Sequence, residues 1–111
     1  MKIPVHQSLK VARNVVRKID LPKEIAKACC LCSWSNGREQ GYSISQYVKN
    51  KQLVIAECRN SDSIIVVYGN IDQFDMQTNQ PNESIWQTNR KSFRYDKVED
   101  AAKFIMKYFS E

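Results

Sequence analysis

Residues 42–68 decide the fold, and they read YSISQYVKNKQLVIAECRNSDSIIVVY. Residues 42–48 alternate between apolar and polar side chains, which is typical of a β-strand with one buried face. Two more apolar runs follow at residues 52–58 and 63–68, each after a short polar turn. Because turns this short join antiparallel neighbours, the stretch predicts three strands of an antiparallel meander.

The segment that follows carries weaker strand signals. Residues 71–77, 84–88 and 92–95 are candidates for short strands, and we expect up to two of them to join the meander, for a total of three to five strands. The apolar runs inside residues 52–58 and 63–68 are unbroken, so the central strands are either covered on both faces or part of a strongly curled sheet.

Two helices are predicted before the sheet. Residues 8–19 have the period of 3.6 that marks an amphipathic helix, with Ser8 as the expected N-cap. Its apolar stripe consists of Val11, Ala12, Val15, Val16 and Ile19. Pro22 can begin a second helix but cannot continue the first, and we expect that helix at residues 22–32.

One helix is predicted after the sheet. Asp96 precedes Glu99 by three residues, which is the spacing of a capping box, and Lys103 and Lys107 follow where the helix dipole favours cations. The apolar stripe consists of Val98, Ala101, Ala102, Ile105 and Phe109. We therefore expect residues 1–111 to form a single α+β domain with two N-terminal helices, a curled antiparallel meander of three to five strands, and a C-terminal helix packed on the sheet.

Composition narrows the function classes. The chain has no apolar run near the roughly 20 residues of a membrane span, and its first residues contain no apolar leader, so we expect a cytoplasmic protein that does not bind a membrane. With three glycines there is no glycine-rich phosphate loop, and with one histidine there is no histidine pair for a metal. We expect a protein without catalytic activity and without a cofactor.

The cysteines offer an alternative. Cys29, Cys30 and Cys32 lie within four residues, and Cys58 is the fourth. The C-x-x-C spacing falls at the end of a predicted helix, where the dipole does not stabilise a thiolate, so we interpret these cysteines as small buried side chains. A thiol or zinc site stays open as an alternative, with His6 as the additional ligand.

The charge is unevenly distributed along the chain. Residues 1–51 carry ten Lys or Arg against three acids, a net +7, whereas residues 52–111 carry seven against nine, a net −2. Lys10, Arg13 and Arg17 lie on the face of the first helix opposite its apolar stripe. Any solvated helix has a polar face, but here the balancing acids are missing, which favours an anionic partner.

A second cationic segment lies near the C-terminus. Arg90, Lys91 and Arg94 are interleaved with aromatic side chains, a combination that can stack unpaired bases. The aromatics are Trp86, Phe93 and Tyr95. Alternation along a strand would instead put Phe93 on a core face and Arg94 on a solvent face, and we favour that explanation.

These observations favour a small binding module that uses a basic helix face to hold an anionic partner, with nucleic acid first and an acidic protein second. The alternative is a protein–protein adaptor or small regulatory subunit that binds through an exposed strand edge or its aromatic residues. A dimer formed through such an edge belongs to the same alternative, and the sequence does not fix the oligomeric state.

Overall fold

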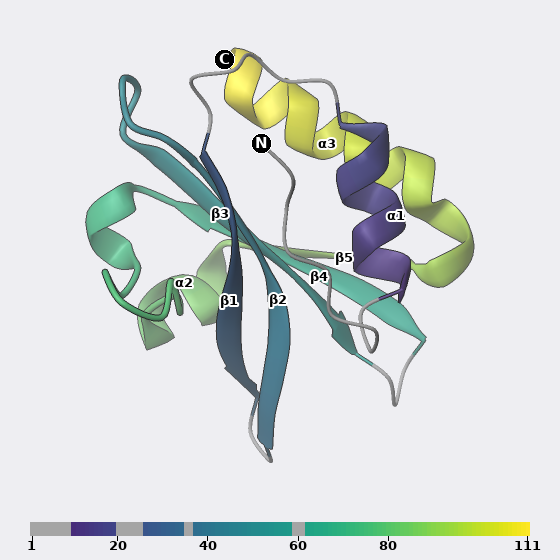
Figure 1. The fold of residues 1–111 in the computed structure, drawn as a ribbon, viewed down its shortest axis with the longest axis horizontal. Coiled ribbons are helices and arrows are strands. Elements are labelled where there is room, and N and C mark those ends of the chain that lie inside the picture. Colours follow the sequence, from purple (N-terminus) through teal and green to yellow (C-terminus); the bar gives the residue numbers. More distant parts are fainter. Residues whose placement is uncertain (1–9, 20–25, 35–36, 59–61) are drawn as a thin grey trace.

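The computed structural model describes residues 10–19, 26–34, 37–58 and 62–111, with the side chains of residues 26–40 and of Cys58 outside that description. Figure 1 shows a sheet with helices packed against it. In chain order the elements are α1 (Lys10–Lys18), β1 (Ala26–Trp34), β2 (Gly37–Gln46), β3 (Lys51–Cys58), β4 (Ser63–Gly69), the 3-10 helix η2 (Ile71–Gln73), α2 (Glu83–Thr88), β5 (Arg90–Arg94), the 3-10 helix η3 (Tyr95–Lys97) and α3 (Val98–Ser110).

The sheet is a five-stranded antiparallel meander in the order β1-β2-β3-β4-β5. In its centre Tyr42 pairs with Ile55, and Leu53 pairs with Tyr68. The three strands predicted from residues 42–68 are therefore confirmed as β2, β3 and β4, but the predicted bounds of the first strand are wrong, because β2 spans Gly37–Gln46 and residues 47 and 48 lie in the exposed turn that follows. The predicted strand at residues 92–95 is confirmed as β5. The α+β class is confirmed as well.

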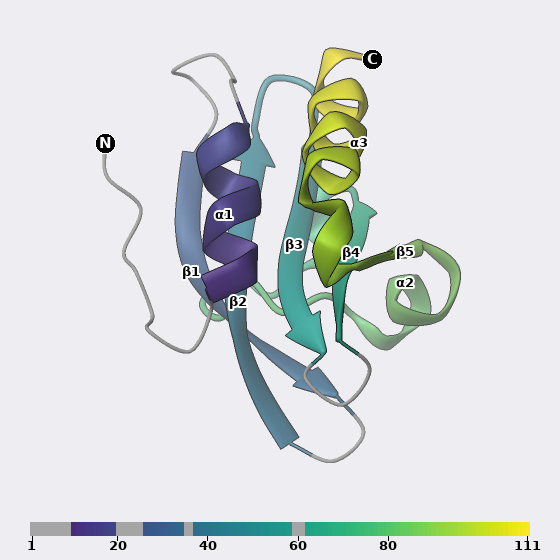
Figure 2. The same cartoon turned by 90° about the vertical axis from the view of Figure 1, so that its right-hand side faces the viewer.

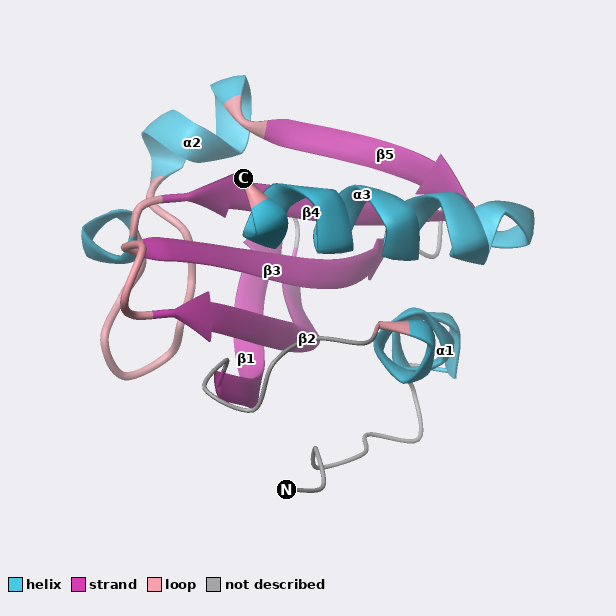
Figure 3. Ribbon diagram, turned by 90° about the horizontal axis from the view of Figure 1, so that it is seen from above, coloured by secondary structure: helices cyan, strands magenta, loops and turns pink. Residues whose placement is uncertain are grey.

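Helices α1 and α3 cover one face of the sheet, as Figures 2 and 3 show. Side chains from both helices and from β2, β3 and β4 form one core there, which includes Val15, Ile55 and Ile105, all at 0% exposure. The predicted apolar stripes of both helices contribute to this core. The C-terminal helix therefore packs on the sheet as expected.

The opposite face of the sheet has a smaller core. Val54 and Val67 from the central strands pack under Phe74 and Ile85, with Trp86 half-buried beside them. Since β3 and β4 are covered on both faces, their side chains are apolar at successive positions. This explains the unbroken apolar runs in the sequence.

The predicted helix at residues 22–32 is wrong in the part that the structure describes, because Ala26–Trp34 forms strand β1. The strand pairs with β2 along its whole length, from Ala26 opposite Ser45 to Trp34 opposite Gly37. Short apolar segments satisfy helical and extended spacing about equally well, and the backbone hydrogen bonds to β2 decide between them. Only one helix among the described residues precedes the sheet.

Two of the weaker strand predictions are also wrong. Within residues 71–77 the 3-10 helix η2 covers Ile71–Gln73, and Phe74 then forms a single bridge with Pro81. Residues 84–88 lie in α2, whose N-cap Asn82 accepts a hydrogen bond from the Ile85 backbone N–H at 3.1 Å. A side-chain cap satisfies one of the amides that a helix start leaves unpaired, which favours a helix even in this short segment.

The predicted capping box at the start of α3 is wrong. The N-cap is Lys97, which makes no side-chain capping hydrogen bond, because η3 precedes the helix directly. Asp96 and Glu99 form ion pairs with Arg94 and Lys18 instead. Ser8, the expected cap of α1, lies outside the described residues.

Candidate functional site

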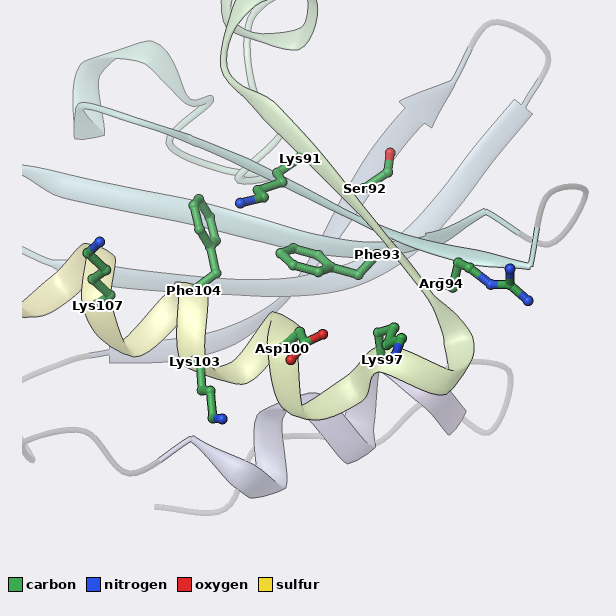
Figure 4. A pocket seen from close by; sticks show the side chains of 9 residues that line it. All are labelled: Lys91, Ser92, Phe93, Arg94, Lys97, Asp100, Lys103, Phe104 and Lys107. Carbon is green, nitrogen blue, oxygen red and sulfur yellow. The ribbon is translucent and has the colours of Figure 1, made fainter.

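A groove lies between the edge strand β5 and the helix α3, and we call it the cationic groove. It is a shallow groove that is widely open to solvent, with a volume of about 610 Å³. Nine residues line it, as Figure 4 shows: Lys91, Ser92, Phe93, Arg94, Lys97, Asp100, Lys103, Phe104 and Lys107. Five of these side chains are cationic and one is acidic, a net +4 in a chain whose total charge is +5.

Because side chains alternate between the two faces of a strand, every second side chain of β5 points toward the groove. Lys91 pairs with Val66 and Phe93 pairs with Ile64, and both of these β4 residues are buried in the core beneath α1 and α3. Because directly paired residues of neighbouring strands point to the same face, Lys91 and Phe93 point toward α3. The prediction that Phe93 lies on a core face is therefore confirmed.

The other wall of the groove is one side of α3. Asp100, Lys103, Phe104 and Lys107 follow the spacing i, i+3, i+4 and i+7, which places them along a single helical stripe. The buried stripe that includes Ile105 runs beside it and holds the helix on the sheet. The groove side chains of α3 are thus positioned by a well-packed helix, which limits their backbone motion.

Two half-buried phenylalanine rings form the apolar part of the groove. The ring centroids of Phe93 and Phe104 are 5.9 Å apart, and Phe104 also contacts Tyr68 edge-on at 5.6 Å. The Lys91 ammonium lies 5.0 Å from the Phe104 centroid and 5.6 Å from that of Phe93. A cation–π contact at an exposed site stabilises by about 0.5–1 kcal/mol, so Lys91 covers the rings but is only weakly held there.

Two nearby acids pair with cations at the ends of the groove or outside it. The Glu99 carboxylate lies 3.7 Å from the Lys18 ammonium of α1, and the Asp96 carboxylate lies 3.6 Å from Nε of Arg94. All four side chains are substantially exposed, so each pair contributes about 0–1 kcal/mol. Asp100 is the one acid among the residues that line the groove.

Tyr108 extends the aromatic row beyond the groove. Its hydroxyl donates a hydrogen bond to the Gly69 carbonyl oxygen at 2.9 Å, and its ring lies 5.4 Å from that of Tyr68. Burial raises the pKa of the Tyr108 hydroxyl above its ordinary value, and Tyr68 raises it further. The hydroxyl therefore stays protonated at neutral pH and anchors α3 to the end of β4.

The structure places the six predicted site residues in two separate groups. Lys91 and Arg94 line the groove, whereas Arg90 is exposed on the same strand without lining it. Lys10, Arg13 and Arg17 lie on α1, and none of them is among the nine lining residues. Lys10 and Arg17 are exposed, while Arg13 is half-buried.

Sequence reasoning missed six of the nine lining residues, namely Ser92, Lys97, Asp100, Lys103, Phe104 and Lys107. The two lysines of α3 were explained by the helix dipole alone. A signal was present, because Lys103, Phe104 and Lys107 lie beside the apolar stripe at helical spacing, only a few residues after the cationic strand. What the sequence does not show is that α3 folds back over β5.

A second hollow lies in the loop after β4, beside the acids Asp72 and Asp75. The Asp75 carboxylate accepts hydrogen bonds from the backbone N–H groups of Thr78 at 2.9 Å and Gln77 at 2.8 Å, which lower the pKa of that carboxyl. The Asp75 carboxylate therefore stabilises the turn that contains it.

The described part of the chain contains neither a cluster of metal ligands nor a helix that could span a membrane. No group of three or more His, Cys, Asp or Glu is arranged there to hold a metal ion. The backbones of Cys29, Cys30 and Cys32 lie in β1, so the helical spacing assumed for them does not apply, and their side chains lie outside the description. None of the described helices has the length and hydrophobicity of a membrane span.

Comparison with known proteins gives no family and no relative. No protein-family model matches the chain, and no curated protein or solved structure matches it either.

Proposed function

We propose that this protein is a non-catalytic, cytoplasmic binding module that holds nucleic acid through the cationic groove. The observation that carries the proposal is the separation of charge around α3. Five cations surround the groove with one acid among them, while Glu99 faces α1 and pairs with Lys18. Such a concentration of positive charge attracts a polyanion and accelerates its association.

The residue types in the groove suit nucleic acid better than a small anion. Lysines provide mobile point charges that pair with successive phosphates, and the phenylalanine rings provide an apolar surface between them. A small anion would use the cations and leave the rings uncovered. The basic face of α1 provides exposed charge at Lys10 and Arg17, which would support long-range attraction.

The proposal predicts a steep dependence on salt. If four of the groove's cations each neutralise one phosphate, the logarithm of the binding constant falls with the logarithm of salt concentration with a slope of roughly −3 to −4. Fluorescence anisotropy with short labelled single strands and duplexes, titrated at about 50 and 200 mM salt, measures this slope. An absence of binding to both kinds of nucleic acid at the lower salt concentration would contradict the proposal.

A second candidate function is a protein–protein adaptor, and one observation favours it. Among the side chains that the structure describes, three large apolar ones are highly exposed, Tyr47 at 65%, Val48 at 87% and Met76 at 96%. The turn that contains Tyr47 and Val48 is tied to the loop after β4, where the Asn50 side chain accepts a hydrogen bond from Ile71 N at 3.2 Å. Size-exclusion chromatography with light scattering, followed by pull-down with a Val48→Ser control, tests this candidate.

A further inference from the structure

We infer that the ligand of the cationic groove is a single-stranded nucleic acid, whose bases contact the phenylalanine floor while its phosphates contact the surrounding lysines. The inference rests on the proposed function and names the ligand class for the same site. It starts from the position of the aromatic rings. Phe93 points from β5 toward α3, and Phe104 points from α3 toward β5, as Figure 4 shows.

The rings are held in place before any ligand binds. Both are half-buried and packed against the core beneath α3, and Phe104 contacts both Phe93 and Tyr68. An aromatic surface that is fixed by the fold loses little conformational entropy when a base stacks on it. Stacking on aromatic side chains is how proteins hold unpaired bases with little dependence on sequence.

Lys91 links the apolar and the charged parts of the groove. Its ammonium lies over both rings, at 5.0 Å from the Phe104 centroid and 5.6 Å from that of Phe93. A base that stacks on Phe104 displaces this ammonium, which then lies beside the phosphate attached to that base. The exchange replaces a weak cation–π contact with an ion pair and a stacked base.

The cations of α3 are spaced along the path of a strand. Lys103 and Lys107 are one helical turn apart, about 6 Å along the axis, and Lys97 precedes the helix at the end where Arg94 lies. In Figure 4 the two rings lie between β5 and α3, whereas the Lys103 side chain extends from the other side of α3 and Arg94 extends outward from the end of β5. A strand that follows the groove meets cations along its length.

A duplex does not fit this arrangement. Its phosphates are accessible, but the flat faces of its bases are stacked inside the helix and cannot reach the rings. Proteins that read a duplex commonly insert a protruding helix or ribbon into a groove of the DNA. Here Phe104 and the cations of α3 line a concave surface beside β5. The groove therefore selects unpaired nucleotides.

The test compares ligands that differ in one property. Three labelled probes of equal length are used in fluorescence anisotropy at constant salt: a thymidylate strand, the same strand with abasic sites in place of its bases, and a duplex. We expect the thymidylate strand to bind about tenfold more tightly than either of the others. A ribothymidylate strand added as a fourth probe differs from the thymidylate strand only in its 2′-hydroxyl groups, and it therefore shows whether RNA or DNA is the preferred single strand.

Phe104→Leu is the critical variant, because leucine keeps an apolar side chain and removes the aromatic face. We expect it to lose the tenfold preference for the thymidylate strand and to leave the affinity for the abasic strand unchanged. Lys103→Gln is the matched control on the same helix face, and it should weaken the thymidylate and abasic strands equally. Circular dichroism and thermal melting establish that both variants are folded.

A measurement on the unaltered protein covers the case in which Phe104→Leu fails to fold. A strand that contains 5-bromouracil is crosslinked by light, and the modified peptide is located by mass spectrometry. Crosslinks to Phe93 or Phe104 support the inference, and crosslinks confined to α1 overturn it. Equal affinities for the thymidylate and abasic strands, or tighter binding of the duplex, would overturn the inference and leave the proposed function standing. If no probe binds at low salt, both are overturned.

Discussion

The two cationic regions of this protein differ in what surrounds their charges. The face of α1 carries Lys10, Arg13 and Arg17 on a convex helix whose apolar side is buried. The cationic groove is concave, is lined by two aromatic rings, and belongs to the half of the chain with a net charge of −2. Net charge along the sequence therefore did not locate the denser cationic surface, because the folded chain pairs Glu99 with Lys18 outside the groove.

Each region is held on the sheet by buried side chains of its helix, α3 for the groove and α1 for the other region. Substitutions of these buried side chains should have the largest effects, and the effects are on the free energy of unfolding. Ile105, at 0% exposure, holds α3 on the sheet, and Ile105→Ala should lower the free energy of unfolding by about 2–5 kcal/mol. Val15→Ala in α1 removes less apolar volume and should cost about 1–3 kcal/mol. Guanidinium denaturation measures both values. A larger loss for Val15→Ala would show that α1 is the more tightly packed of the two helices.

The next largest effect is expected when the cations of the groove and those of α1 are neutralised in separate variants and the affinities for a single strand are compared. The groove variant carries Lys91→Gln, Lys103→Gln and Lys107→Gln, and the matched α1 variant carries Lys10→Gln, Arg13→Gln and Arg17→Gln. If each phosphate contact contributes on the order of 1 kcal/mol, the groove variant should bind a single strand about 100-fold more weakly at low salt. Its salt slope should also become less steep by roughly 2.

The α1 variant removes the same number of charges, and we expect it to reduce affinity by less than about tenfold, through long-range attraction alone. Anisotropy titrations at matched ionic strength measure both variants. A greater loss in the α1 variant would reverse the comparison and place the binding surface on α1.

Removing the acid from the groove should have the smallest effect and the opposite sign. Asp100→Asn removes the one acid that lines the groove and leaves only the Arg94–Asp96 ion pair to offset its cations. The affinity for a single strand should rise about two- to fivefold, as expected for an exposed charge. Glu99→Gln changes the net charge of the chain equally but lies on the side of α3 that faces α1. The two variants should therefore differ in anisotropy titrations, and equal gains would mean that total charge, rather than the groove, governs binding.

Much of the fold could be predicted because its signals are local. The alternation that places Tyr42 and Ile44 on one face of β2, and the helical stripes that include Val15 and Ile105, all contribute to the core beneath α1 and α3. Strand β1 was not predictable in this way, since Ala26–Trp34 satisfies helical spacing and its identity depends on pairing with β2, a contact between separate segments. The short helix α2 depends on the cap at Asn82, a signal that resembles an ordinary polar loop.

The candidate site was only partly predictable for a similar reason. Lys91 and Arg94 were recognisable from the mixture of charge and aromatic side chains in β5. Phe104 and Lys107 were not, because they join the site only after η3 reverses the chain and α3 crosses back beside β5. A groove made by two elements requires their arrangement in space, and one periodic pattern in the sequence describes only a single element.

Backbone amide NMR during titration with a short thymidylate strand tests the central claim most directly, because it locates the bound strand on the unaltered protein. We predict that the largest chemical-shift changes fall within residues 91–107, which contain all nine residues of the groove, and decrease when salt is raised. Changes confined to residues 10–18 of α1, or no changes at low salt, would contradict the account.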